Sequence, residues 1–209
     1  MRSCILGFAI TGYTLFCTPC IADQTGEPPQ KMVLQIDGRQ AEFVVGEKLK
    51  LTGAFSDPTI QVVASPTRQF SYGGINFEYP ANFVWDAETD GDAYRSWTMS
   101  GNECTIMYFT FANELTADVF AASLREQFGQ ANSTIESVSR RLGGLRLEGK
   151  RVVANIAGNR MAQDVLNVPA PTGKSRLLVL QDVPDEEGVG LEEAKRVHRL
   201  LSESFRLAK

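Results

Sequence analysis

The stretch Tyr94–Phe111 constrains the fold most, because it reads as two β-strands joined by a turn at residues 100–103. The second strand places apolar side chains on both of its faces, which is typical of a central strand that is covered on both sides. One face carries Cys104, Ile106, Tyr108 and Thr110, and the other carries Thr105, Met107, Phe109 and Phe111. The stretch therefore predicts a β-sheet with one layer above it and another below it.

The first 22 residues have the three-part layout of a secretory signal peptide. A positive start at Arg2 precedes an uncharged apolar run over residues 4–16, and small residues follow, up to Ala22. The run is too short to predict a membrane span. An uncleaved anchor and a lipoprotein are the alternatives, and Pro19 before Cys20 disfavours the lipoprotein. We expect export with cleavage after residue 22.

Cleavage would change both the cysteine content and the charge of the chain. Cys4, Cys17 and Cys20 would leave, so the mature chain would keep Cys104 alone and form no internal disulfide. The 21 basic residues less Arg2 leave 20, against 25 acidic residues. An acidic balance does not suggest nucleic-acid binding and gives no electrostatic attraction to an anionic membrane. An exported chain without disulfides fits a bacterial periplasm or cell envelope.

The mature chain divides into three parts by composition. Residues 23–30 (DQTGEPPQ) are polar and proline-containing, and they predict a flexible leader. Residues 31–66 predict an N-terminal β extension with a hairpin turn at Asp37-Gly38, either as a separate small sheet or as extra strands of the main one. Residues 67–209 predict the main domain.

Two helices are expected in the main domain. Residues 115–129 have an N-cap at Thr116, an apolar stripe with i+4 spacing and a C-terminal glycine at Gly129. Residues 191–207 form an amphipathic pattern that closes the chain. Between the helices, strands are expected at 134–142, 145–157, 160–168 and 176–181, as an antiparallel meander.

Two motifs resemble ligand-binding loops without completing them. Gly173-Lys174-Ser175 resembles the end of a phosphate-binding loop, but the required earlier glycine is Val168 and a strand follows. The carboxylates and glycine of residues 86–92 resemble the first half of an EF-hand loop, but its twelfth position is Trp97. We expect a hairpin loop at the first motif and a solvated acidic loop at the second, with calcium binding kept as an alternative.

Single reactive side chains give no catalytic constellation. His198 is the only histidine, and we expect it to pack at the edge of the last helix's apolar stripe. Cys104 lies in an apolar strand and is expected to be a buried thiol rather than a nucleophile. The aromatic residues Tyr72, Tyr79 and Trp85 either line a binding patch or belong to the core. We therefore assign no catalytic, cofactor-binding or metal-binding residue and no cofactor.

The order of these elements resembles the PsbP/Mog-type α/β/α sandwich family. The resemblance covers about residues 67–207 and includes Phe77-Glu78-Tyr79-Pro80, the two helices and the strand LLVLQD before the last helix. It implies an α+β fold in which a largely antiparallel sheet is covered by helices on its faces, here with an N-terminal β-hairpin extension. It also implies a non-enzymatic accessory or binding module, and it transfers no functional residue. Residues 31–64 depart from the minimal family pattern.

The leading functional hypothesis is an exported, non-catalytic binding or assembly-accessory protein of the cell envelope. Its expected partner is another envelope protein or a small ligand. The alternatives are an envelope hydrolase whose site is assembled from scattered residues, and a calcium-responsive module that uses residues 86–92.

Overall fold

The computed structural model describes residues 25–52, 57–185, 187 and 189–208. The expected signal peptide at residues 1–22, with three of the four cysteines, lies outside the described residues. Of the residues described, 52% are in strands and 16% are helical. The strands form three antiparallel sheets.

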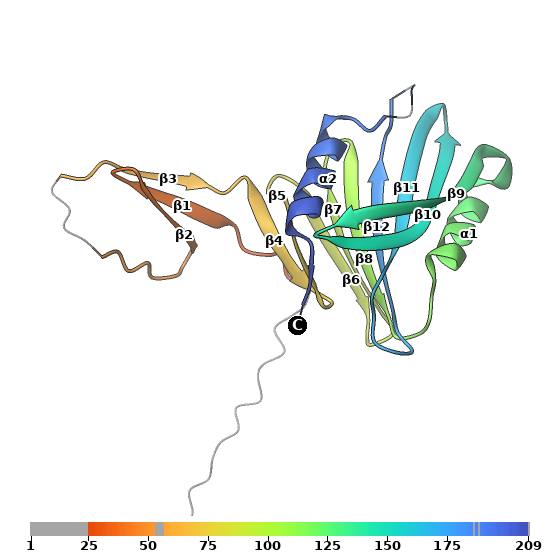
Figure 1. Cartoon of the computed structure of the whole chain (residues 1–209), viewed down its shortest axis with the longest axis horizontal. Coiled ribbons are helices and arrows are strands. Elements are labelled where there is room, and N and C mark those ends of the chain that lie inside the picture. Colours follow the sequence, from red (N-terminus) through yellow and green to blue (C-terminus); the bar gives the residue numbers. More distant parts are fainter. Residues whose placement is uncertain (1–24, 53–56, 186, 188, 209) are drawn as a thin grey trace, which may run out of the picture.

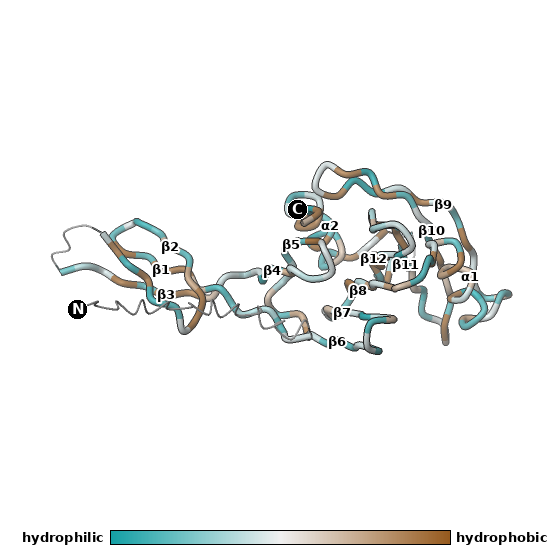
Figure 2. Tube along the Cα trace, turned by 90° about the horizontal axis from the view of Figure 1, so that it is seen from below, coloured by the Kyte–Doolittle hydropathy of each residue, from teal (hydrophilic) through white to brown (hydrophobic). Residues whose placement is uncertain are grey.

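The N-terminal sheet projects away from the rest of the described structure (Figures 1 and 2). It consists of β1 (Lys31–Ile36), β2 (Arg39–Val44) and β3 (Ile60–Ala64), in the order β2-β1-β3. Asp37 and Gly38 both have positive φ, at 45° and 79°, as a two-residue type I′ hairpin turn requires. The predicted hairpin is confirmed, and of the two arrangements considered the strands adopt the separate sheet.

The largest sheet has seven strands in the order β6-β7-β8-β12-β11-β10-β9. β8 lies between β7 and β12, so the central position predicted for residues 104–111 is confirmed. The predicted meander is confirmed as well, because β9 to β12 pair in succession. The strands are β6 (Val84–Asp90), β7 (Tyr94–Ser100), β8 (Cys104–Phe111), β9 (Ser133–Leu142), β10 (Leu145–Ile156), β11 (Asn159–Val168) and β12 (Ser175–Asp182).

A third sheet packs against one face of the seven-stranded sheet. It contains β4 (Thr67–Tyr72), β5 (Ile75–Pro80) and the short β13 (Arg206–Leu207), in the order β13-β5-β4. Phe70 of β4 meets Trp97 of β7 and Tyr108 of β8 edge to face, with ring centroids 5.8 and 5.7 Å apart. All three side chains are fully buried, so the main core lies between two sheets.

The two α-helices lie near residues where the sequence predicts them. In α1 (Ala117–Phe128), the Thr116 hydroxyl accepts from the Val119 amide and Gly129 follows with φ 87°. α1 packs on β9 to β11, whereas α2 (Glu192–Ser204) packs on β5, β8 and β9 (Figure 1). A single 3₁₀ turn, η1 (Gln130–Asn132), follows α1.

The expected α/β/α sandwich is wrong. The described structure is mostly β and resembles a β-sandwich, because the core face of the large sheet is covered mainly by the β13-β5-β4 sheet. On the opposite face α1 covers β9 to β11 and leaves β6 uncovered, where Asp86 and Glu88 are exposed. Both helices were predicted, but two helices are too few to form two covering layers.

Candidate functional site

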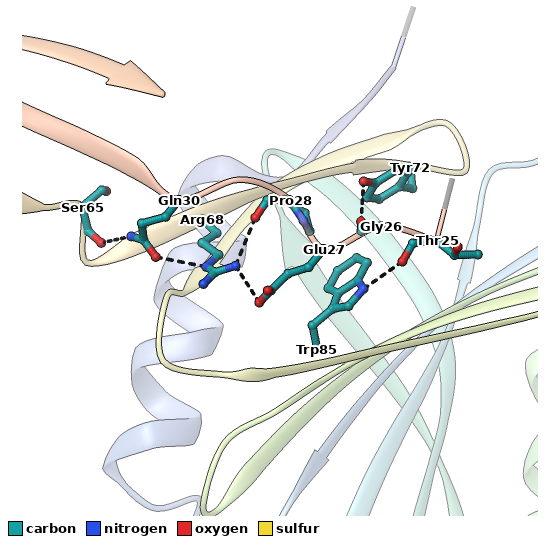
Figure 3. A network of polar contacts seen from close by, with 9 residues as sticks. All are labelled: Thr25, Gly26, Glu27, Pro28, Gln30, Ser65, Arg68, Tyr72 and Trp85. Carbon is teal, nitrogen blue, oxygen red and sulfur yellow. Dashed lines mark hydrogen bonds and ion pairs between the residues drawn. The ribbon is translucent and has the colours of Figure 1, made fainter. Parts of the chain in front are cut away.

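Residues 25–30 lie along side chains that project from β4 and β6 (Figure 3). Three donors of the main domain bind three main-chain carbonyls of this leader. The bonds run from Trp85 Nε1 to Thr25 O (3.0 Å), from Tyr72 Oη to Gly26 O (2.7 Å) and from Arg68 Nη1 to Pro28 O (3.1 Å). These three bonds are made to the main chain, and Arg68 adds contacts to leader side chains. We call this surface, formed by Arg68, Tyr72, Tyr79 and Trp85, the leader groove.

Arg68 is the centre of the polar contacts in the leader groove. Its guanidinium lies 2.6 Å from Glu27 Oε1, and its Nε donates to Gln30 Oε1 at 3.1 Å. Gln30 in turn donates to Ser65 O at 2.7 Å, at the end of the N-terminal sheet. The Arg68 side chain is only 18% exposed, so these charge-assisted contacts lie partly out of water, where they are stronger than on an open surface.

The aromatic side chains of the groove are themselves packed in place. Tyr72 stacks on the buried Trp97 at 5.8 Å, and Tyr79 stacks on Trp85 at 6.3 Å. Pro28 is buried among the leader contacts, although the rest of the leader is at least partly exposed. A proline also biases the residue before it towards extended backbone. The groove therefore holds a proline-containing segment against packed aromatic side chains.

Tyr79 contributes an unsatisfied group beneath the leader. Its side chain is fully buried, and its hydroxyl has no hydrogen-bond partner among the described residues. Burial raises the pKa of Tyr79, and the positive charge of Arg68 opposes the shift. The phenol is therefore a neutral donor, and a buried donor without an acceptor is uncommon in folded proteins.

Sequence reasoning found part of this site. Tyr72, Tyr79 and Trp85 were considered as either a binding patch or core residues, and the structure brings all three together. The contacts of Arg68 and Gln30 were missed, because the composition of residues 23–30 predicted a flexible leader. The adjacent prolines, which restrict the backbone, were the one available signal for these contacts.

A second polar cluster lies within the core face of the large sheet and was not predicted. Asp164 on β11 has a side chain only 3% exposed, and it accepts from Arg140 Nε at 2.7 Å and from Arg151 Nη1 at 3.1 Å. Arg151 also lies 3.7 Å from Asp182 on β12. The cluster is a largely buried ion-pair network that links β9, β10, β11 and β12.

His198 of α2 lies beside this network and is half-buried, as expected. Burial lowers the pKa of His198, and Arg140 lowers it further, while Asp164 and Asp182 oppose the shift. Burial raises the pKa of Asp182, and Arg151 opposes that shift. A neutral imidazole next to two paired carboxylates is a packed histidine, and its partners already have structural contacts.

Cys104 is buried at the start of β8, as expected. Burial, together with the carboxylates of Asp182 and Glu193, raises the pKa of the Cys104 thiol to about 12. The Glu193 carboxylate accepts from the amides of Cys104 (3.0 Å) and Glu103 (2.6 Å), so it ties α2 to this strand. A thiol that stays protonated is a poor nucleophile.

The two loop-like motifs have different outcomes. Ser175 begins β12, and its hydroxyl accepts from the Leu115 amide and donates to Asn113 O at 2.9 Å, so Gly173-Lys174-Ser175 is part of a hairpin loop as expected. The expected acidic loop is wrong, because residues 84–90 form strand β6. A strand lacks the turn by which an EF-hand loop brings the carboxylates of its first, third and fifth positions together around calcium.

Within the described residues, no three histidine, cysteine, aspartate or glutamate side chains are grouped closely enough to hold a metal ion. Neither α-helix in the described part of the chain combines the length and the apolar character that a membrane span needs.

Comparisons with known proteins leave the family open. No family model matches the chain, and no curated protein matches it. A crystal structure of LpqN, described as involved in cell envelope biogenesis of Mycobacterium tuberculosis, aligns with 68% of this chain and 91% of its own. The identity is 12% and the TM-score is 0.38, a level that does not establish a common fold. The resemblance to the PsbP/Mog family stays a prediction.

Proposed function

We propose that this chain is an exported binding or assembly-accessory protein of the cell envelope that captures proline-containing segments of a partner protein in the leader groove. In this proposal the chain's own residues 25–30 occupy the groove until the partner segment displaces them. The proposed export rests on the signal-peptide pattern of residues 1–22.

The observation that carries the proposal is the set of three main-chain carbonyls held by Trp85, Tyr72 and Arg68. Aromatic grooves that bind proline-rich segments use the same chemistry, in which side-chain donors meet carbonyls of a backbone already restricted to an extended form. Because main-chain carbonyls occur in every protein, a partner segment with a similarly placed proline can make the same bonds.

The tether sets how strongly the leader competes with a partner. A segment joined to its own binding site by a short linker has an effective concentration on the order of millimolar. A partner segment that makes only the leader's contacts must reach a comparable concentration, or it must add contacts outside the groove. The leader thus acts as an intramolecular competitor, and only partners that bind more tightly than the leader alone can displace it.

The test uses residues 23–209 and a variant in which residues 25–29 are replaced by five glycine and serine residues. A synthetic peptide of residues 23–30 is added to both, and binding is followed by tryptophan fluorescence, to which Trp85 in the groove and the buried Trp97 both contribute. We expect saturable binding to the variant and at least about tenfold weaker binding to the intact chain. A peptide with both prolines changed to alanine is the matched control.

The proposal is refuted if the variant keeps its circular dichroism and cooperative unfolding but does not bind the peptide. The leader would then be a structural strap and not the occupant of a binding site. If the variant does not fold, Glu27→Ala in the intact chain weakens the leader without touching the core, and the same comparison applies. Trp85→Phe in the emptied chain should reduce the fluorescence response and weaken binding measured by calorimetry, because the indole donor is lost.

A further inference from the structure

We propose that a hollow at one end of the large sheet, lined by Arg95, Lys174 and Arg176, binds the phosphate group of a small ligand. The hollow has a volume of about 520 Å³, within the usual range for small-molecule sites. It lies between the β4–β5 turn, the β6–β7 turn and the β11–β12 loop. The proposal is independent of the leader groove.

Strand register places the two arginines in one row. Arg95 of β7 and Arg176 of β12 are both directly opposite Thr110 of β8, one on each side. Directly opposed residues of neighbouring strands point to the same face of a sheet, and three strands span about 10 Å. Two guanidinium groups with a hydroxyl between them therefore line the same face, an arrangement suited to an oxyanion with several acceptor oxygens.

Two glycines in the β4–β5 turn allow the backbone to pack closely against Arg176. Gly73 and Gly74 have φ values of 57° and 82°, and Tyr108 donates its hydroxyl to Gly73 O at 2.8 Å. A Cβ atom at Gly74 would overlap the Arg176 guanidinium, so the turn approaches that group as closely as only glycine allows. The close packing holds the Arg176 side chain at the edge of the hollow before any ligand arrives.

Two positive charges at the hollow, those of Arg176 and Lys174, are not balanced by ion pairs among the described residues. Arg176 is half-buried and forms no ion pair within the described part of the chain, and its Nη1 donates to Pro169 O at 3.0 Å. Arg95 lies 3.5 Å from Asp92, a fully exposed carboxylate. Lys174 is exposed and adds a second positive charge that has no ion pair within the described part of the chain. A doubly charged phosphate group matches this excess, whereas a single carboxylate would leave one positive charge uncompensated.

The test titrates residues 23–209 with inorganic phosphate and with glycerol phosphate at constant ionic strength. Binding is read from the amide NMR signals of Gly73, Thr110 and Ser175. We expect saturable shifts at these positions, and a Kd that rises with added salt. Tighter binding of glycerol phosphate would identify a phosphate ester as the ligand, and equal binding would identify the phosphate group alone as what is recognised.

Three variants that each remove one positive charge distinguish a specific phosphate site from non-specific electrostatic attraction. Arg176→Gln should weaken binding about tenfold or more, because charge-assisted hydrogen bonds are lost. Lys174→Gln should weaken it a few-fold, and this exposed residue provides the test even if Arg176→Gln fails to fold. Arg160→Gln, an exposed residue at the other end of β11, should leave the Kd unchanged. Equal losses in all three variants, or no saturation up to about 10 mM phosphate, would overturn the proposal.

Discussion

Replacing Asp164 by asparagine should destabilise the protein strongly, although the change removes no atoms from the core. The Asp164 carboxylate is almost fully buried and is the shared acceptor of Arg140 and Arg151. In Asp164→Asn the negative charge disappears, and an amide NH₂ group is placed against two guanidinium groups. Both arginines then lose their main partner in a region with little water.

The magnitude follows from the exposure of the two arginines. Breaking a buried ion pair from one side typically costs about 3–5 kcal/mol, because the remaining charge stays buried without a partner. Here Arg140 is 33% exposed and can turn towards water, and Arg151 keeps Asp182 at 3.7 Å. We therefore expect a loss near the lower limit, about 3 kcal/mol, which corresponds to a fall in Tm of about 6–12 °C for a domain of this size.

The assay is urea unfolding at pH 7 with circular dichroism, with Glu148→Gln as the matched control. Glu148 forms a similarly short ion pair with Arg146, at 2.6 Å, but both side chains are more than 60% exposed. Loss of this pair should cost less than about 1 kcal/mol. Equal costs for the two variants, or a cost below about 1 kcal/mol for Asp164→Asn, would refute the argument that burial decides the contribution.

Three further predictions concern single residues. The pKa of Cys104 is raised to about 12, against an ordinary 9.0, so the contribution of this thiol to stability is intact below pH 9 and is lost as the pH rises towards 12. The free energy of unfolding should therefore fall at alkaline pH. In Cys104→Ala, unfolding titrations should show a smaller alkaline fall, by up to about 4 kcal/mol. Because the pKa of His198 is lowered, its contribution to stability is intact above pH 6.5 and is lost as the pH falls through its pKa in the folded state. NMR of this single imidazole should give a pKa below 6.5, and a value at or above 6.5 would contradict its burial. Gly143→Ala should lower the free energy of unfolding by more than twice the roughly 1 kcal/mol expected for Gly144→Ala. Both glycines have positive φ, but only a Cβ at Gly143 would overlap a main-chain carbonyl. Equal losses in urea unfolding would exclude that close approach.

Local signals in the sequence predicted individual elements well. The 94–111 hairpin follows from alternation around a polar turn, and α1 follows from its cap at Thr116 and its terminal Gly129. Each of these signals lies within one element, so no knowledge of the remaining chain is needed to interpret it. The layer that covers each face of the sheet depends on contacts between distant segments, and there the predicted sandwich was wrong.

The ion-pair network and the leader groove depend on contacts that leave little trace in the sequence. Asp164 lies 24 residues from Arg140 and 13 from Arg151, and only the strand register brings the three together. Three bonds of the leader groove are made to main-chain carbonyls, which every residue carries, so these contacts cannot be predicted from the sequence of the leader. The carboxylates of residues 86–90 show the opposite problem, since a spacing of two fits both a calcium loop and a strand.

The carboxylates of β6 have a consequence for how copies of this chain meet. β6 is an edge strand of the large sheet, and such an edge can add a strand from another molecule. Asp86, Glu88 and Asp90 lie at alternate, exposed positions along it. Two copies joined edge to edge would bring two rows of negative charge within about 5 Å of each other, and like charges in opposed positions destabilise a strand pair. The acidic strand therefore disfavours pairing of this edge with the same edge of a second copy.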